Sequence, residues 1–149
     1  MFTYGLRMTL CALASVVPLV AHGQTISVTV ENSFGQTINL SSNTCNNSTC
    51  SPVPPSTIAN GATSTPFGAV TGTGQSEPQI TTRYHHSSGS QDYGCQFQAS
   101  AVTVGATCST PVISQSSYAG VYPSPHCNLV SQSTNPSNCN LTVVFQMAQ

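Results

Sequence analysis

Histidines and carboxylates are the side chains of this sequence with the widest chemical range, and they are few. They comprise four histidines and three acids: His22, His85, His86, His126, Glu31, Glu77 and Asp92. Glycoside hydrolysis needs two carboxyl groups about 5–10 Å apart, and the spacing of these acids predicts no such pair. No Gly-x-Ser-x-Gly sequence marks a serine nucleophile. The sequence therefore favours a protein without catalytic activity.

The adjacent histidines His85 and His86 are the first candidates for a metal site. Neighbouring residues of a strand point to opposite faces of the sheet, so the pair holds one ion only if it lies in a loop. Asp92 or His126, brought close by folding, would complete such a site. We predict surface histidines and no metal, with the metal site as the alternative.

Residues 1–23 have the layout of a secretory signal peptide. A positive charge precedes the apolar run Met8–Val20, and small residues follow at Ala21 and Gly23, as such signals require. The run of about 13 residues is shorter than the roughly 20 that cross a bilayer as a helix. We predict that residues 24–149 form one secreted domain, and we favour cleavage after Gly23 over cleavage after Ala21.

Cleavage after Ala21 would place His22 at the N-terminus, and this start resembles the copper-dependent polysaccharide monooxygenases. In that family an N-terminal histidine and a second histidine hold copper on the flat end of a β-sandwich. The resemblance implies His22 and His86 as a ligand pair, with His85 or His126 as other choices for the second ligand. It also implies an axial tyrosine, from Tyr84, Tyr93 or Tyr122.

Six cysteines follow the predicted signal: Cys45, Cys50, Cys95, Cys108, Cys127 and Cys139. An even number in an exported chain of this size predicts three disulfides. Six cysteines allow 15 pairings, and the sequence does not choose among them. The most local set of pairs is Cys45–Cys50, Cys95–Cys108 and Cys127–Cys139.

Charged side chains are nearly absent after residue 23. There is no lysine, a single arginine, Arg83, and three acids, which gives a formal net charge of −2. Nucleic-acid binding needs several basic side chains to neutralise phosphates, and attraction to an anionic membrane needs a basic patch. The composition therefore argues against both kinds of partner.

Apolar and polar residues alternate in several stretches: Thr25–Glu31, Gln36–Ser41, Gln79–His86 and Asn140–Met147. This is the pattern of half-buried antiparallel strands, and the first two, separated by turn residues, predict a hairpin. In Tyr93–Cys108 the core-facing side switches near Ser100, which predicts a bulge or a change of sheet. We predict an all-β fold, an antiparallel β-sandwich of about seven or eight strands stapled by disulfides.

We expect a loop-borne contact surface where the tyrosines and histidines concentrate, made of Ser42–Pro55, Tyr84–Tyr93 and Tyr118–Cys127. The candidate binding residues are Tyr84, His85, His86, Asp92, Tyr93, Tyr122 and His126. Tyrosine rings stack on sugar rings, and Ser, Asn and Gln side chains bond to hydroxyl groups without charge, so this surface suits neutral glycans. The alternative is that the tyrosines only cap the ends of the sandwich.

Four asparagines begin Asn-x-Ser/Thr sequons: Asn39, Asn46, Asn47 and Asn140. In a eukaryotic source these are candidates for N-glycosylation. We expect Asn46 and Asn47, between two cysteines, to be the most accessible.

The segments SVTVENSFGQTINL, PPSTIANGATSTPFG and TGTG in the first half of the chain resemble the opening of the aegerolysins, small β-sandwich proteins that bind membrane lipids. The shared features are a valine-alternating strand, an Asn/Gly turn, an Ile/Leu strand and a P-x-x-I-x-x-G step. The resemblance implies a β-sandwich and a lipid partner. It assigns no functional residue here, because aegerolysin lipid-facing surfaces are rich in tryptophan and this chain has none.

We therefore predict a secreted, non-enzymatic interaction protein without a cofactor. Its role would be at a cell surface, in a matrix or directed at a host, and its extracellular ligand a glycan or a lipid. A copper-dependent polysaccharide monooxygenase-like protein and a purely structural surface protein are the alternatives.

Overall fold

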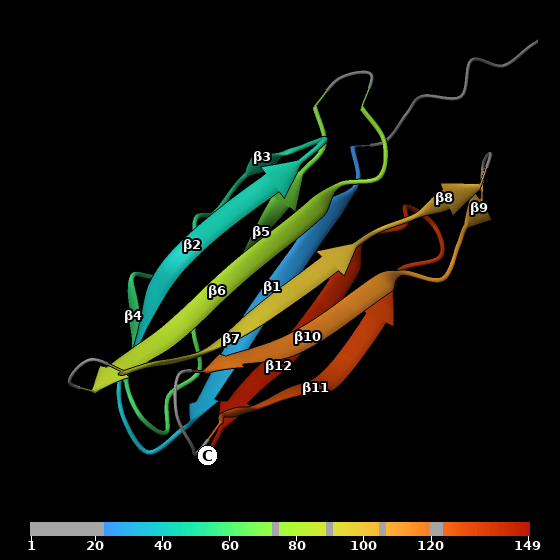
Figure 1. Cartoon of the computed structure of the whole chain (residues 1–149). Helices are drawn as coiled ribbons and strands as arrows, with labels where there is room; N and C mark the ends of the chain where they lie inside the picture. The colour runs from blue at the N-terminus through green and yellow to red at the C-terminus, as the bar shows by residue number, and fades with distance from the viewer. Residues whose placement is uncertain (1–22, 73–74, 89–90, 105–106, 120–123) are drawn as a thin grey trace, which may run out of the picture.

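The computed structural model describes residues 23–72, 75–88, 91–104, 107–119 and 124–149. These ranges contain twelve β-strands and no helix (Figure 1). Accordingly, no helix that could cross a membrane is found in them. His22 and Tyr122 lie outside the described residues.

Two five-stranded sheets face each other and form a β-sandwich, which confirms the predicted fold class (Figure 1). In spatial order, sheet A comprises β11 (His126–Thr134), β12 (Leu141–Ala148), β1 (Thr25–Ser33), β5 (Phe67–Val70) and β3 (Thr49–Cys50). Sheet B comprises β10 (Val112–Ala119), β7 (Gln91–Ser100), β6 (Gln79–Ser88), β2 (Ile38–Asn46) and β4 (Thr57–Ile58). The strands β8 (Thr103–Val104) and β9 (Thr107–Cys108) form a separate small sheet. The count exceeds the predicted seven or eight because four strands, β3, β4, β8 and β9, have only two residues.

Strand pairing is antiparallel throughout the described sheets except between β1 and β12, which run parallel. The predicted hairpin of the first two strands is wrong, because β1 belongs to sheet A and β2 to sheet B. The buried amide of Asn32 stabilises this crossing between sheets. Its Nδ2 donates to the backbone oxygens of Gln36 and Ile58, and its Oδ1 accepts from the backbone N–H of Phe34.

The core lies between the sheets and is built from the apolar half of each alternating strand. Sheet A contributes Ile26, Val28, Val30, Leu141, Val143, Phe145 and Met147. Sheet B contributes Ile38, Ile80, Tyr84, Cys95, Phe97 and Ala99. The rings of Phe97 and Phe145 stack across the interface, with their centroids 4.8 Å apart. Burial of such side chains stabilises the fold by roughly 1.5–3 kcal/mol each.

Three disulfides are present, as predicted, but only the Cys45–Cys50 pair follows the most local set. Cys95 bonds to Cys127, and Cys108 bonds to Cys139. The local set is wrong for these four because pairing follows the sandwich and not the sequence. Cys95 points into the core from β7 of sheet B and reaches β11 of sheet A. Three disulfides indicate an oxidising environment.

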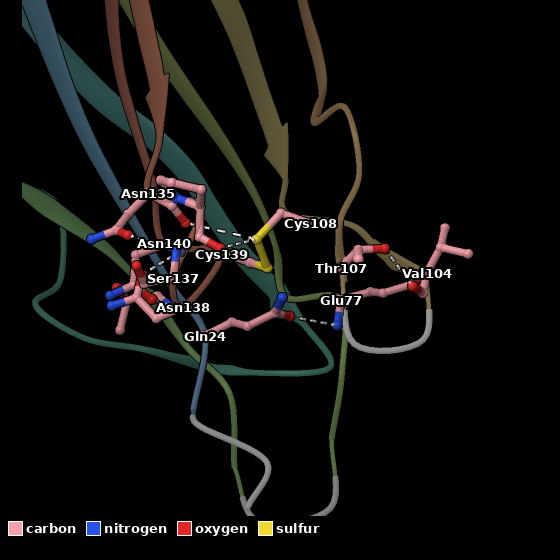
Figure 2. The surroundings of a disulfide bond; sticks show 12 residues. Gln24, Glu77, Val104, Thr107, Cys108, Asn135, Ser137, Asn138, Cys139 and Asn140 are labelled. Carbon is pink, nitrogen blue, oxygen red and sulfur yellow. Dashed lines mark hydrogen bonds between the residues drawn. A yellow bond between two sulfur atoms is a disulfide. The ribbon is translucent and has the colours of Figure 1, made fainter. Parts of the chain in front are cut away.

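The Cys108–Cys139 bond holds the small β8–β9 sheet against the turn before β12 (Figure 2). The strand β7 ends at Ser100, and the chain then leaves sheet B for this small sheet. The predicted switch near Ser100 is therefore confirmed as a change of sheet. In the same view the side chain of Gln24 reaches across to Glu77. The backbone N–H of Glu77 donates to Oε1 of Gln24 over 3.2 Å (Figure 2).

Candidate binding face on sheet B

Four neighbouring strands of sheet B, namely β10, β7, β6 and β2, present one continuous face away from the core. Residues directly opposite one another on paired strands share a face of the sheet. The strand registers therefore define three outward rows: Tyr118, Gly94, His85 and Asn39; Ser116, Gln96, Arg83 and Ser42; Ser114, Gln98, Thr81 and Thr44. Together with Asp92 and Ser87, these residues form what we call the outer face of sheet B.

Tyr118 lies across the centre of this face, over Gly94 of the neighbouring strand. A Cβ atom on residue 94 would collide with Cζ, Oη and Cε1 of the tyrosine. The glycine is needed for this close approach of the ring to the backbone. The phenol oxygen lies 3.4 Å from the backbone oxygen of Tyr84, one strand further, and hydrogen-bonds Ser41 at the β2 bulge. The hydroxyl end of the ring is thus held against the sheet, and the ring is half-exposed.

The environment of Tyr118 keeps its hydroxyl protonated. Burial raises the pKa of this phenol above its ordinary value, the charge of Asp92 raises it further, and the bond to Ser41 and the charge of Arg83 lower it. Burial is the largest of these effects. The face therefore presents a neutral aromatic ring at physiological pH.

Arg83 is exposed, and its guanidinium group lies over this ring. Its Nε–H donates to Oε1 of Gln96 over 2.7 Å, and its guanidinium carbon lies 5.9 Å from the centroid of the Tyr118 ring. That separation is within the range of a cation–π interaction. Two contacts thus orient the guanidinium group on the outer face.

His85 and Asp92 form a hydrogen-bonded pair on the same face. Nδ1 of His85 lies 2.5 Å from Oδ1 of Asp92, and the hydroxyl of Ser87 donates to the same carboxylate oxygen over 3.0 Å. The side chains of His85 and Asp92 are 23% and 51% exposed. The structure thus brings together two of the predicted binding residues.

Two predicted tyrosines among the described residues do not join this face. Tyr84 is fully buried, and its hydroxyl donates to the backbone oxygen of Pro55 over 2.8 Å. Tyr93 also belongs to the buried core. Both rings point inward because their strands alternate, so neither is accessible to a large ligand.

The two adjacent histidines lie on opposite faces of β6, as predicted. His86 points away from His85, and its Nδ1 lies 3.0 Å from the backbone oxygen of Thr37. His126 begins β11 in sheet A and is exposed. Within the described residues, no group of three or more His, Cys, Asp or Glu side chains could hold a metal ion. The copper hypothesis depends on His22, which lies outside the described residues.

The sequence did not single out Gly94, Gln96 and Gln98, and it placed Tyr118 only at the start of an expected contact loop. The expectation of a loop is wrong for Tyr118, which lies in the strand β10. A signal for part of the face was present, because the alternation of Gln79–His86 places Arg83 and His85 on the same side of the strand. The approach of Tyr118 to Gly94 depends on the pairing of β10 with β7, and no local pattern encodes it.

Three of the sequon asparagines are exposed: Asn39, Asn46 and Asn47. Asn39 lies on the outer face of sheet B, directly opposite His85. Asn140 is half-buried, and its Oδ1 accepts a hydrogen bond from the backbone N–H of Thr25 over 2.9 Å. Asn140 therefore has a structural role.

Comparison with protein-family models and with curated proteins finds no match for this chain. The resemblance to aegerolysins stays a prediction.

Proposed function

We propose that this protein is a secreted, non-enzymatic glycan-binding module and that the outer face of sheet B is its contact surface. The observation that carries the proposal is the ring of Tyr118, which lies over Gly94 with hydrogen-bonding side chains around it. The three disulfides support an extracellular site of action.

The chemistry of the face suits a sugar ring. The C–H groups on one face of a pyranose pack against an aromatic ring, and its hydroxyl groups need donors and acceptors at the edge. Gln96, Gln98 and His85 lie in neighbouring positions and offer both. Tyrosine also has few rotatable bonds, so its ordering costs little entropy on binding.

Preorganisation favours binding at this place. The Tyr118 ring is already fixed by its contact with Gly94 and by its hydroxyl contacts, and the Arg83 guanidinium is oriented by Gln96. Groups that are ordered before the ligand arrives lose less freedom on association. A lipid surface fits less well, because the outward rows are polar apart from one half-exposed ring.

The direct test is a glycan-array screen of the secreted protein, followed by calorimetric titration with the glycans that it retains. We expect retained glycans, and we expect Tyr118→Ala to weaken binding at least about tenfold, since it removes a central aromatic contact. Thr29→Ala, on the outward side of β1 in sheet A, is the matched control and should bind like the wild type.

Circular dichroism and thermal melting of both variants would establish that each is folded. The proposal fails if the array retains no glycan, or if folded Tyr118→Ala binds as tightly as the wild type.

A further inference from the structure

Arg83 is a charge without an ion-pair partner among the described residues, in a protein that has few charges. It is the single basic side chain, apart from histidines, after residue 23. The acids are placed elsewhere or are already engaged. Asp92 interacts with His85 and Ser87, Glu31 lies on β1 of sheet A, and Glu77 precedes β6. Among the described residues, the contact between a basic and an acidic side chain is that of His85 with Asp92. Arg83 therefore has no acidic partner among them.

The guanidinium group is held in a way that leaves its terminal nitrogens as the remaining donors. Its Nε–H is bound to Gln96, so the four N–H bonds on the two Nη atoms remain from the five that arginine carries. This planar fork matches the two oxygens of a carboxylate, and such bonds are about twice as strong as those between neutral groups.

The distance from the guanidinium group to the ring defines what can bridge them. The guanidinium carbon lies 5.9 Å from the centroid of the Tyr118 ring. A single sugar ring that packs on the part of the tyrosine left exposed, with a carboxylate at its edge, would bring that carboxylate to the guanidinium group. A neutral sugar would contact the aromatic ring but would give Arg83 no negatively charged partner.

We propose that the outer face of sheet B selects glycans that carry a carboxylate, that is, chains containing a uronic or sialic acid. The sugar ring packs on Tyr118 and the carboxylate binds to Arg83. This inference rests on the proposed glycan-binding function and sharpens it. It departs from the neutral ligands that the composition favours, because the fold places the one arginine beside the ring.

The test uses matched ligands on the intact secreted protein. An oligosaccharide of hexuronic acid is titrated alongside the same oligosaccharide after reduction of its carboxyl groups, and a sulfated neutral oligosaccharide forms the third arm. We expect the wild type to bind the acid at least about tenfold more tightly than its reduced form, the typical size of a charge-assisted hydrogen bond. The advantage should shrink as the salt concentration rises.

Variants locate the effect at Arg83. Arg83→Gln should bind the acidic and the reduced ligands equally, and Arg83→Lys should keep part of the preference, because it retains the charge but not the fork. Thr29→Ala serves as the control and should keep the full preference.

The outcomes separate this inference from the function on which it rests. Equal binding of the acidic and reduced ligands by the wild type overturns the inference and leaves the glycan-binding function standing. Tighter binding of the sulfated arm also overturns it. If no arm binds, and the glycan array retains nothing, both the inference and the proposed function fail.

Discussion

The two outward faces of the sandwich are built by the same strand alternation and carry different side chains. On sheet A two outward rows of β11, β12 and β1 hold short residues, Ser27, Thr29, Ser131, Ser133, Thr142 and Val144, and a third row holds Asn128, Gln146 and Glu31, without an aromatic ring or a basic group. On sheet B the equivalent rows hold Tyr118, Arg83, His85, Gln96 and Gln98. Short hydroxyl and aliphatic side chains cover a sheet but offer little reach. Long planar side chains offer rings and paired donors to a ligand.

The difference between the two faces is the reason for proposing that recognition belongs to sheet B. A β-sandwich needs polar outward residues on both sheets, and serine and threonine satisfy that need on sheet A. The arginine and its aromatic neighbour are not required for it. Their placement together on sheet B, in a chain with so few charges, is the basis of our functional proposal.

The largest expected effect is on the connection between the two sheets. Replacing Cys95 and Cys127 together by alanine should destabilise the protein by about 2–5 kcal/mol, because this bond closes a separation of 32 residues. The matched double variant of Cys45 and Cys50, separated by 5 residues, should lose about 1.5 kcal/mol less on the chain-entropy account. Urea unfolding of both variants checks the difference, and equal losses would contradict it.

A subtler change sharpens the contrast between the faces without removing a ligand-contacting group. In Gly94→Ala the new Cβ displaces the half-exposed Tyr118 ring, so glycan binding should fall about tenfold while the free energy of unfolding changes by less than about 1 kcal/mol. Thr29→Ala on sheet A should leave binding unchanged. Calorimetric titration and thermal melting give both numbers. Unchanged binding by Gly94→Ala would argue that the ring position is unimportant.

The third expected effect concerns alkaline stability. Burial raises the pKa of the Tyr84 hydroxyl well above its ordinary value of 10.0. The unfolded chain therefore releases this proton near pH 10 while the folded protein keeps it, so the stabilising contribution is complete below that pH and is lost as the pH rises above it. Tyr84→Phe should lose less stability than the wild type between about pH 9 and pH 11. Denaturant titrations of both proteins across this pH range measure the free energy of unfolding. An equal loss in the two proteins would contradict a raised pKa of Tyr84.

The last prediction concerns the site at which the predicted signal peptide is cleaved. Mass spectrometry of the secreted protein should give Gln24 as the first residue. Reduction should add six hydrogens, since three disulfides open. A chain that starts at His22 and binds one copper ion tightly would support the monooxygenase-like alternative.

The fold could be predicted as far as local patterns determine it. The alternation of Ile26, Val28 and Val30 is a property of neighbouring residues, and it correctly gave a half-buried strand. Pairing between distant segments is not encoded in this way. The parallel contact of β1 with β12 and the bond of Cys95 to Cys127 both depend on which strands meet across the sandwich.

The candidate site was predictable only in part for the same reason. His85 and Asp92 are close in sequence and face each other across the β6–β7 pair. Tyr118 comes from β10, and its position over Gly94 follows from a register that no short motif specifies. The tyrosines near the histidines in sequence, Tyr84 and Tyr93, are in the core.

The most direct test of the central claim is to map a bound glycan by nuclear magnetic resonance. The isotope-labelled secreted protein is titrated with a glycan retained on the array, and the backbone amide shifts are followed. We expect the changes to concentrate at Tyr118, Gly94, Arg83, His85 and Gln96, with none at Ser27, Thr29 and Thr142. Changes concentrated on sheet A, or confined to the connecting loops, would contradict the assignment of recognition to the outer face of sheet B.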